Sequence, residues 1–341
     1  MRLPATFAKY RVAIEAELKA ALADHRSPMY DMMRYHLGWL DEQGHPIAGS
    51  AGKALRPTLC LLACEACAGS WQRALPAAAA LELLHNFSLI HDDIQDDDRE
   101  RRHRPTVWAL WGKPQAINAG TGMWVIANLT LFRLAEHGAP PARQLAALRL
   151  LNETCLRLLE GQYLDISYES RLDVGLAEYL AMIEGKTGTL IAHSLEMGAL
   201  LAAANEQTLR AFRRLGRDVG LAFQIRDDLL GIWGDPAKTG KPVGSDIRRK
   251  KKTLPIVCAL EGADSRSRAE LVAIYQRPTI DEQGLSAVLE ILEEVGARGR
   301  AQRLIQQYSA RALAEVERLA LSAAARSDLV EMIRFLGERE F

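Results

Sequence analysis

The sequence lacks an excess of charge of either sign. Its 341 residues include 43 Lys and Arg against 43 Asp and Glu, so the formal net charge at pH 7 is zero. A chain without net charge has no overall field that draws it onto nucleic acid or an anionic membrane. We therefore expect no nucleic-acid partner, and anion binding has to come from a local patch of basic residues.

Cysteine is scarce, and its spacing suits neither a set of disulfide bonds nor a structural zinc site. Five cysteines are present, an odd number, and Cys60, Cys64 and Cys67 recur at helical spacing within an apolar run. This arrangement differs from the paired CxxC motifs of a zinc site and from the even number of cysteines in disulfide-rich secreted domains. The prediction is reduced, buried cysteines in a cytoplasmic protein.

Long apolar runs and strand-like alternation are also missing. The longest uncharged stretch, residues 114–132, contains Gln115, Asn118 and Asn128, so we interpret it as a core helix and expect no integral membrane segment. The first 22 residues mix acidic and basic side chains and hold no signal-peptide core. No run of β-branched residues alternates with polar ones, which argues against a sheet.

What the sequence has instead is helical periodicity over most of its length. Apolar residues recur three and four positions apart in stretches rich in Ala, Leu, Glu and Arg. These stretches cover residues 5–22, 76–94, 144–164, 176–203 and 297–321. Several are apolar on more than one face, as expected of helices at the centre of a bundle. The prediction is an all-α fold in which residues 1–341 form a single large helical domain.

One apolar stretch ends in a cluster of five aspartates, Asp92, Asp93, Asp96, Asp97 and Asp98. Asp92 and Asp96 are four apart, so on a helix their carboxylates lie on the same face, one turn from each other. Aspartate is a poor helix former and is disfavoured at a helix C-terminus, so the cluster works against local stability. A solvated helix end is the simpler interpretation, but hard carboxylate ligands favour a Mg²⁺ site.

A second acidic pair, Asp227 and Asp228, also follows an apolar helical stretch. Basic residues come after both acidic groups, within residues 99–104 and 238–252. Two carboxylate groups that hold Mg²⁺, with Lys and Arg nearby, suit a substrate that carries phosphates, because metal and bases together neutralise a polyanion.

Seven short motifs occur in the order and at the spacing of a known family. The chain resembles the trans-isoprenyl diphosphate synthases, or polyprenyl synthetases, over about residues 50–260, and is most like the short-chain geranylgeranyl diphosphate synthases. The motifs are GKALRP at 52–57, HDDIQD at 91–96, EGQYLD at 160–165, KTG at 186–188, FQIRDD at 223–228, GKPVGSD at 240–246 and KKTLP at 251–255.

The resemblance implies the isoprenoid synthase type of helical bundle, in which two aspartate-rich motifs face each other across a central cavity. It implies a Mg²⁺-dependent trans-prenyltransferase that condenses isopentenyl diphosphate head to tail with an allylic diphosphate, on which three Mg²⁺ ions sit. Carried over to this chain, Asp92, Asp96 and Asp227 are the metal ligands, and Asp93 and Asp228 support them.

The resemblance also assigns contacts to the two substrates. Lys186 and Lys241, which join the five aspartates in the catalytic set, contact the allylic diphosphate together with Arg101. Gln224 and Thr187 lie beside the growing chain or its diphosphate. Isopentenyl diphosphate is held by Lys53, Arg56, His85 and Arg102, and Lys251 is a further substrate-binding residue.

Members of the family form homodimers, and the apolar helix face around residues 119–132 is expected to make that contact. Four positions depart from the family's usual residues. Gly231 stands where the second motif normally has its third acid, from which we expect weaker metal support but retained function. Ala54 replaces a usual Arg, His103 a usual Gly, and Thr121 stands where Gly-Asp is common.

Product length in the family depends on what blocks the cavity below the first aspartate motif. Ser88 lies four residues before Asp92 and Phe87 lies five before it. One ring at the fifth position, with a small residue at the fourth, resembles the members that stop at C20. We therefore expect geranylgeranyl diphosphate, with farnesyl or C25 diphosphate as alternatives and Trp124 as an alternative floor.

Two other functions compete with condensation. A class I terpene cyclase shares the first motif, and Asn152 and Glu160 have the outer spacing of its second one, but Leu156 occupies the hydroxyl position and cannot bind a metal. Lys53 and Arg56, as bases for a second diphosphate, also favour condensation. A non-catalytic subunit of a heteromeric synthase is the other alternative, although such subunits usually lose an aspartate motif.

Overall fold

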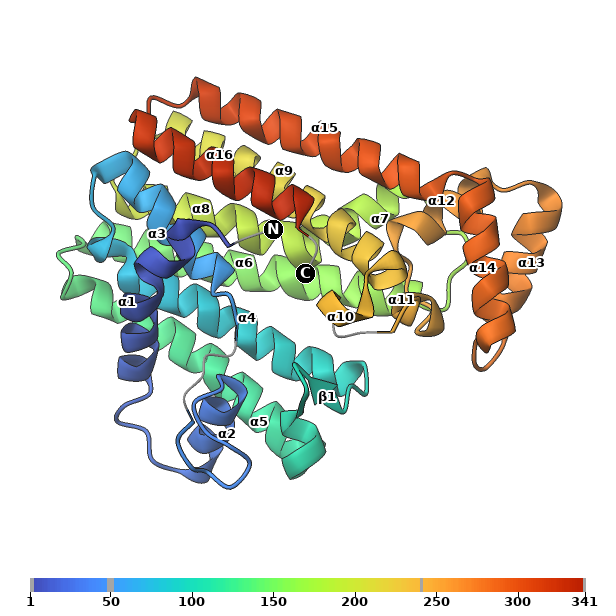
Figure 1. The fold of residues 1–341 in the computed structure, drawn as a ribbon. Helices are drawn as coiled ribbons and strands as arrows, with labels where there is room; N and C mark the ends of the chain where they lie inside the picture. Colours follow the sequence, from blue (N-terminus) through green and yellow to red (C-terminus); the bar gives the residue numbers. More distant parts are fainter. Residues whose placement is uncertain (1–2, 48–51, 240–241, 340–341) are drawn as a thin grey trace.

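The computed structural model describes residues 3–47, 52–239 and 242–339, and its regular structure is almost entirely helical (Figure 1). The longer helices are α1 (Ala5–Ala21), α2 (Pro28–His36), α3 (Leu55–Ala68), α4 (Leu75–Gln95), α5 (Val107–Thr130), α6 (Pro141–Tyr168), α7 (Leu176–Ile183), α8 (Thr189–Leu201), α9 (Glu206–Trp233), α12 (Leu254–Gly262), α13 (Ser265–Gln276), α14 (Glu282–Glu294), α15 (Ala297–Arg318) and α16 (Ala323–Glu338). Shorter turns are η1 (Gln72–Ala74), η2 (Leu131–Ala135), η3 (Glu184–Gly188), α10 (Pro236–Thr239) and α11 (Ser245–Arg248). The predicted all-α class is confirmed.

Helices α4 and α8 form the centre of the bundle. Helix α4 has Pro76 in its first turn, where a missing N–H is tolerated, and its residues are buried on every face down to Asp93. It packs on α3, α5 and α8, while α9 packs on α8 and α15. A helix that is apolar all round belongs in the interior, so the apolar stretch that carries the first acidic motif positions it inside the molecule.

The predicted helix over residues 176–203 is interrupted. It divides into α7, a π-helical turn at η3 and α8. The turn passes very close to α6, since a Cβ added at Gly161 would lie 2.0 Å from the backbone nitrogen of Lys186. Such π-helical insertions often mark functional sites, and this one carries Lys186 and Thr187.

A small antiparallel hairpin follows α4, although the sequence argued against a sheet. Strands β1 (Glu100–Arg101) and β2 (Arg104–Pro105) are joined by Arg102 and His103, which have φ angles of 54° and 60°. Positive φ at both central residues is the type I′ turn that suits a two-residue hairpin. His103 therefore adopts the left-handed conformation that a glycine would adopt more easily.

The first and last helices meet over the same side of the bundle. The rings of Phe7 in α1 and Phe335 in α16 lie 5.9 Å apart, edge to face. At one end of the molecule in Figure 1, α12, α13 and α14 gather around a separate apolar cluster that includes Val257 and Leu292. That residues 1–341 form a single domain stays a prediction.

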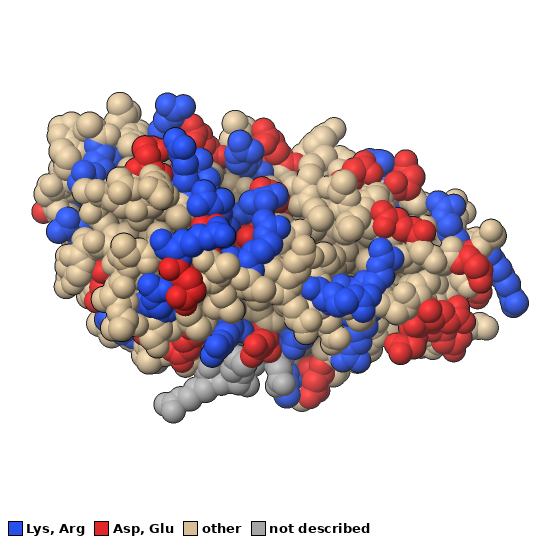
Figure 2. All heavy atoms as spheres, turned by 90° about the horizontal axis from the view of Figure 1, so that it is seen from above, with Lys and Arg blue, Asp and Glu red and all other residues tan. Residues whose placement is uncertain are grey.

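The cysteines, the apolar helices and the surface charges bear on the expectations drawn from the sequence. The cysteines are free, and all but the half-buried Cys67 are buried. Within residues 3–47, 52–239 and 242–339, no helix combines the length and apolar character needed to cross a membrane. Acidic and basic side chains both occur over the face seen in Figure 2, and several Lys and Arg side chains gather left of its centre.

Candidate active site

The first acidic motif lies at the C-terminal end of α4, where it meets two lysines. Nζ of Lys251 is 3.3 Å from Oδ2 of Asp96. Burial raises the pKa of Asp92, and the neighbouring charge of Asp96 raises it further, while Lys186 lowers it. The carboxylate pair thus carries a concentrated negative charge that needs cations close by.

Asp93 points away from this pair and holds the hairpin. Its Oδ1 accepts hydrogen bonds from Arg101, with Nε at 2.8 Å and a second guanidinium nitrogen at 2.7 Å, and its side chain is 2% exposed. Burial raises the pKa of Asp93 to about 6 despite these bonds. Its contact positions Arg101, one of the residues predicted to bind the allylic diphosphate.

Lys186 is held at the π-helical turn by an ion pair with Asp165 of α6. Burial opposes its charge, but Asp165 and Asp92 together raise its pKa. The ammonium therefore stays protonated at neutral pH, facing the first motif. The role of Asp165 was missed from the sequence, although its motif, EGQYLD, was recognised.

The second acidic motif divides its two carboxylates between different tasks. Asp228 is buried and accepts hydrogen bonds from the Tyr179 hydroxyl at 2.6 Å, the Leu254 backbone N–H at 2.8 Å and the Gln224 amide at 3.0 Å. Gln224 in turn accepts a hydrogen bond of 2.7 Å from the Thr187 hydroxyl. Burial raises the pKa of Asp228 to about 7, and the three donors oppose the shift. This network ties α9 to the π-helical turn and to α12.

Asp227, by contrast, faces outward, with 54% of its side chain exposed. Its Oδ1 lies 2.8 Å from a guanidinium nitrogen of Arg339, beyond the end of α16, and Nε of Arg226 donates to the Arg339 carbonyl at 2.7 Å. The Arg339 guanidinium also lies 3.9 Å from the ring centroid of Phe223. No local pattern marked Arg339, since its partner is 112 residues away in the chain.

A cavity of about 480 Å³ lies between the second motif and the ends of α1, α3 and α16. Its cationic and polar lining includes all four residues predicted to hold isopentenyl diphosphate. These are Lys53, Arg56, His85 and Arg102, joined by Arg339 and Glu82. The structure thus brings together the four predicted residues, which come from three separate segments of the chain.

Cationic side chains outnumber acidic ones in the lining of this cavity, where Glu82 is the one acid among the residues named above. Burial lowers the pKa of Arg56 to about 10, and Glu82 opposes the shift, so the guanidinium is charged at neutral pH. Nε of Arg56 is buried and lacks a hydrogen-bond partner among the described residues. Burial, together with Arg56 and Arg102, lowers the pKa of His85 well below its usual value. The imidazole is therefore neutral, and the cavity suits an anion.

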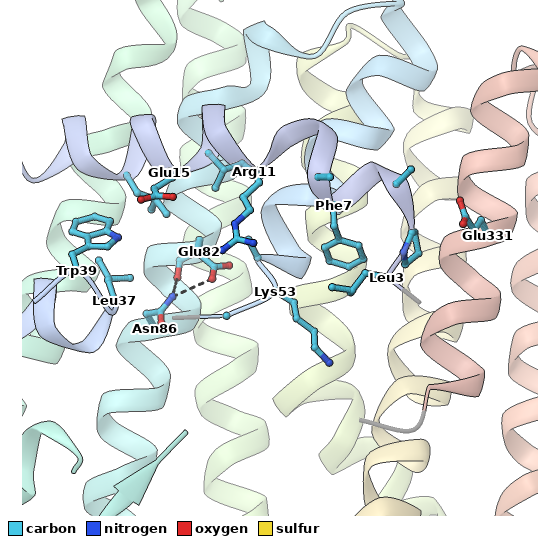
Figure 3. A pocket seen from close by; sticks show the side chains of 17 residues that line it. Leu3, Phe7, Arg11, Glu15, Leu37, Trp39, Lys53, Glu82, Asn86 and Glu331 are labelled. Atoms are coloured by element: carbon cyan, nitrogen blue, oxygen red, sulfur yellow. Dashed lines mark hydrogen bonds between the residues drawn. The ribbon is translucent and has the colours of Figure 1, made fainter. Parts of the chain in front are cut away.

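A larger cavity, of about 810 Å³, adjoins this one and shares Phe7, Lys53 and Glu82 with it. Figure 3 shows Arg11 of α1 and Glu82 of α4 projecting into it, with Asn86 beside Glu82. The Asn86 amide donates to the Glu82 carbonyl at 2.8 Å and to Oε1 at 3.3 Å (Figure 3). Glu82 was not recognised from the sequence as part of the site.

Near the first motif, the ring of Phe87 packs against two other rings. The ring centroids of Phe87 lie 5.0 Å from His91 and 5.9 Å from Trp124 of α5. Close approach of α5 depends on Gly120, where an added Cβ would lie 2.4 Å from the His91 ring. Ser88 is small and buried, and its hydroxyl donates to the His85 carbonyl at 2.8 Å. Phe87 and Trp124 thus form one aromatic layer.

The structure leaves one predicted residue without a position, since Lys241 lies outside the described residues. Within the described residues, no three His, Cys, Asp or Glu side chains converge closely enough to hold a metal ion by themselves. Asp92, Asp96 and Asp227 offer hard oxygen ligands, which Mg²⁺ prefers, and Mg²⁺ normally completes its coordination with water and substrate phosphates. The donor set therefore fits Mg²⁺ bound together with a diphosphate.

Comparison with known proteins gives consistent matches over most of the chain. A profile of the family described as polyprenyl synthetase matches residues 38–292. The (2E,6E)-farnesyl diphosphate synthase of Mycobacterium tuberculosis is 42% identical over 323 residues, 94% of this chain and 89% of that protein. The geranylgeranyl diphosphate synthase of the same organism is 40% identical over 327 residues, 95% of this chain and 90% of that protein.

Solved structures agree with these sequence matches. A polyprenyl synthetase from Streptomyces coelicolor A3(2) has a TM-score of 0.90 and 36% identity, over 97% of this chain and 98% of that one. The geranylgeranyl pyrophosphate synthase from Corynebacterium glutamicum, complexed with isoprenyl diphosphate and magnesium, has a TM-score of 0.84 and 27% identity, over 99% and 100%.

Proposed function

Because this chain belongs to the polyprenyl synthetase family, whose enzymes are prenyl diphosphate synthases, we propose that it condenses isopentenyl diphosphate head to tail with an allylic diphosphate in a Mg²⁺-dependent reaction. The observation that carries the proposal is the presence of two separate cationic sites. Lys186 and Lys251 face the first acidic motif, while Lys53, Arg56 and Arg102 meet at a different cavity. Condensation needs a site for each of two diphosphates, whereas cyclisation needs one.

The proposed roles follow from the charges. Three Mg²⁺ ions, when bound between Asp92, Asp96 and Asp227, supply positive charge that stabilises the diphosphate as it leaves the allylic carbon. Lys186, held by Asp165, and Arg101, held by Asp93, supply further fixed positive charge at the same leaving group. Lys241, just after α10, is proposed as another such contact.

The second substrate is held so that its double bond can reach the allylic carbon. Lys53, Arg56 and Arg102 bind its diphosphate, and the neutral His85 donates a hydrogen bond. Apolar residues around Phe87 keep water from the carbocation. Gln224 and Thr187 lie beside the growing isoprenoid chain or its diphosphate. No protein side chain is assigned as the base, since the departing diphosphate takes the proton.

We infer a C20 product. The small Ser88 leaves room directly below the first motif, and the layer formed by Phe87, the residue before it on α4, and Trp124 closes the space further down. The relatives named above include both a farnesyl and a geranylgeranyl synthase, so the lengths of their products do not decide between C15 and C20. The aromatic layer is the argument for C20.

We also propose a homodimer through the outer faces of α5 and α6. The two faces are joined by a 2.9 Å hydrogen bond from Asn152 to Asn128. Large apolar side chains on these faces are exposed, including Val125 at 50%, Leu129 at 51%, Leu156 at 58% and Tyr163 at 71%, and so is Phe132, at 61%, in the adjoining turn η2. Such a surface is unusual for a monomer. Sedimentation should give a dimer, and Phe132→Asp should shift it towards monomer.

The same exposure weakens the cyclase alternative. Asn152, Leu156 and Glu160, which have the approximate spacing of a cyclase metal motif, are exposed on the outer face of α6. The remaining choice between a synthase and a non-catalytic subunit is tested by incubating the protein with isopentenyl diphosphate and each of the C5, C10 and C15 allylic diphosphates. We expect a C20 product that is lost in EDTA and in Asp92→Ala by about a hundredfold or more. No product from any combination would contradict the proposal.

A further inference from the structure

Five consecutive basic residues, 248–252, begin at the end of α11. A run of like charges is usually a solvated segment, but here each of the five side chains has a partner in a different part of the fold. Arg248 lies 2.6 Å from Glu282 at the start of α14, and Nζ of Lys252 donates to the Glu169 carbonyl, just after α6, at 2.9 Å. The run therefore fastens one segment of the chain to several helices.

Two of these basic side chains reach the first acidic motif. The Arg249 guanidinium donates to both carboxylate oxygens of Asp98, one of them at 2.9 Å. Two residues further along, Nζ of Lys251 lies 3.3 Å from Oδ2 of Asp96. Figure 1 shows α11 close to the hairpin that follows α4, in agreement with these contacts. Because 249 pairs with 98 and 251 with 96, the two segments run past each other in opposite directions.

The surrounding backbone holds Asp98 in place independently of Arg249. The Asp98 carbonyl accepts hydrogen bonds of 2.8 Å from the Thr106 hydroxyl and from the Trp108 ring nitrogen, and its N–H donates to the Asp93 carbonyl at 2.9 Å. Only 15% of the Asp98 side chain is exposed. A bidentate pair between an arginine and such a fixed carboxylate is stronger than an ordinary surface ion pair.

The turn between the two contacts has an unfavourable backbone conformation. Lys250 has a φ of 57°, in the left-handed region that residues other than glycine rarely adopt. Its Nζ donates to the Arg277 carbonyl, and the Lys251 N–H donates to the Asp246 carbonyl at 3.0 Å. Both neighbours of Lys250 still reach the first motif, so the direction of Lys251 depends on contacts that hold this turn, including that of Arg249.

We propose that the ion pair between Asp98 and Arg249 is a clasp that positions Lys251 at the site of the allylic diphosphate. Both are positioning residues, and neither belongs to the seven motifs that the chain shares with its family. The inference rests on the proposed function, because it takes the first motif to be the site of a diphosphate. Without the clasp, the loop can turn Lys251 away from Asp96, and the diphosphate loses a fixed positive charge.

The clasp predicts an effect opposite to that of charge alone. Asp98→Asn removes a negative charge near an anion site, so simple electrostatics predicts tighter binding of a diphosphate. If Asp98 holds Arg249, the same substitution releases the loop and weakens binding, as Arg249→Gln does. Two substitutions that change the net charge in opposite directions should thus have the same effect.

The test measures binding of inorganic pyrophosphate in the presence of Mg²⁺ by isothermal titration calorimetry, so that no catalysis is needed. We expect Asp98→Asn and Arg249→Gln each to weaken binding about tenfold, the effect of losing one hydrogen bond to a charged group. The matched control is Arg248→Gln, which removes the neighbouring positive charge, whose partner Glu282 is 85% exposed. It should change binding by no more than about twofold, since exposed ion pairs contribute little.

A charge-swapped variant separates the clasp from direct metal binding by Asp98. Asp98→Arg/Arg249→Asp rebuilds the ion pair with its partners exchanged, so it should bind pyrophosphate more tightly than either single charge reversal. A direct metal ligand at position 98 would leave the double variant as weak as Asp98→Arg. That result would overturn the proposal, and so would unchanged or tighter binding by Asp98→Asn. If the double variant does not fold, the comparison of Asp98→Asn with Arg248→Gln decides.

Steady-state kinetics gives a second readout. Asp98→Asn and Arg249→Gln should each raise KM for the allylic diphosphate about tenfold and leave KM for isopentenyl diphosphate nearly unchanged. A merely structural role of the ion pair would raise both KM values together, and equal increases would therefore contradict the clasp.

Product formation by the wild type is measured separately. A wild type that binds pyrophosphate and depends on the clasp to do so, but condenses no substrates, would refute the proposed function and leave the clasp standing. A wild type that forms product while Asp98→Asn and Arg249→Gln bind pyrophosphate normally would do the reverse. A wild type that binds no pyrophosphate in the presence of Mg²⁺ would overturn both.

Discussion

At the scale of single residues, the candidate site depends on acidic side chains that bind no substrate themselves. Asp93 holds Arg101, Asp165 holds Lys186, and Glu82 lies beside Arg56 and Arg102. Each is at least partly buried, so each acts on its cation in a medium of lower polarity than water. The cations are thereby fixed in place before the proposed diphosphate substrates bind.

Glu82 offers the sharpest test of this arrangement. Glu82→Gln removes the negative charge beside Arg56 and Arg102 while keeping the shape of the side chain and an acceptor for Asn86. Since the charge of Glu82 acts on both guanidinium groups within a buried site of low polarity, we expect the loss of this positioning charge to raise KM for isopentenyl diphosphate about tenfold, which corresponds to about 1.4 kcal/mol. KM for the allylic diphosphate should change much less, as measured by steady-state kinetics with each substrate varied in turn.

The control is Glu15→Gln, which also lines the larger cavity but pairs with the exposed Lys19. It should leave both KM values unchanged. Equal increases of both KM values in Glu82→Gln would show that Glu82 supports the whole site rather than the isopentenyl diphosphate pocket.

The aromatic layer below the first motif makes a prediction about product length. Phe87→Ala removes the ring that lies 5.9 Å from Trp124, so the growing chain should extend further and the product should become longer than C20. Ser88→Phe places a ring directly below Asp92 and should shorten the product to C15. Mass spectrometry of the products checks both, and unchanged lengths in both variants would place the floor elsewhere.

At the scale of secondary-structure elements, the sequence predicted what is local. The helical spacing of Asp92 and Asp96, the buried character of α4 and the basic run after α9 could all be predicted from short windows. Contacts such as Asp227 with Arg339 and Lys186 with Asp165 join residues 112 and 21 positions apart. Their pairing depends on how helices pack, and no periodicity within one helix encodes it.

The interruption of the helix over residues 176–203 could not be predicted for a similar reason. The π-helical turn exists where η3 packs against Gly161 of α6, and the turn itself has no breaking proline. Likewise, the hairpin after α4 has no glycine at its turn, so its short strands gave no signal. In both places, packing determines a backbone conformation that the local residues do not favour.

The hairpin turn therefore stores strain that a substitution should relieve. His103 has a φ of 60° and an exposed side chain, and the left-handed conformation costs a non-glycine residue about 1–2 kcal/mol. Glycine regains this but loses about 0.5–1 kcal/mol of chain entropy on folding. We expect His103→Gly to raise the free energy of unfolding by about 0.5–1 kcal/mol, measured by urea denaturation.

The comparison for this prediction is Arg102→Gly, which relieves the same kind of strain at φ 54°. It should also stabilise the fold but weaken binding of isopentenyl diphosphate, because it removes a proposed substrate contact. A His103→Gly variant less stable than the wild type would show that the imidazole makes contacts worth more than the strain.

At the scale of the whole molecule, the bundle holds charged and neutral titratable groups with opposite preferences for pH. Burial raises the pKa of Asp93 to about 6 and of Asp228 to about 7. In the unfolded chain the pKa of an aspartate is near 4, so between pH 4 and pH 6 to 7 the folded state binds more protons than the unfolded state. The contribution of these two groups to stability is therefore full below about pH 4 and is lost as the pH rises through their folded pKa values. Buried histidines work in the opposite direction.

His193 in α8 shows this opposite dependence and can be isolated by mutation. It is 8% exposed, its Nδ1 lies 2.7 Å from the Thr154 hydroxyl, and burial lowers its pKa to about 4. An unfolded histidine titrates near 6.5, so the unfolded state binds an extra proton between pH 6.5 and 4, and stability is full above 6.5 and lost as the pH falls. Between pH 7 and pH 5 this one group should lower the free energy of unfolding by about 2 kcal/mol.

Replacing the histidine tests this dependence. In His193→Gln, the free energy of unfolding should fall about 2 kcal/mol less between pH 7 and pH 5 than in the wild type. The control His45→Gln, at an exposed position, should show the same pH dependence as the wild type. Parallel profiles for the wild type and His193→Gln would mean that the buried imidazole takes up its proton without opening the core.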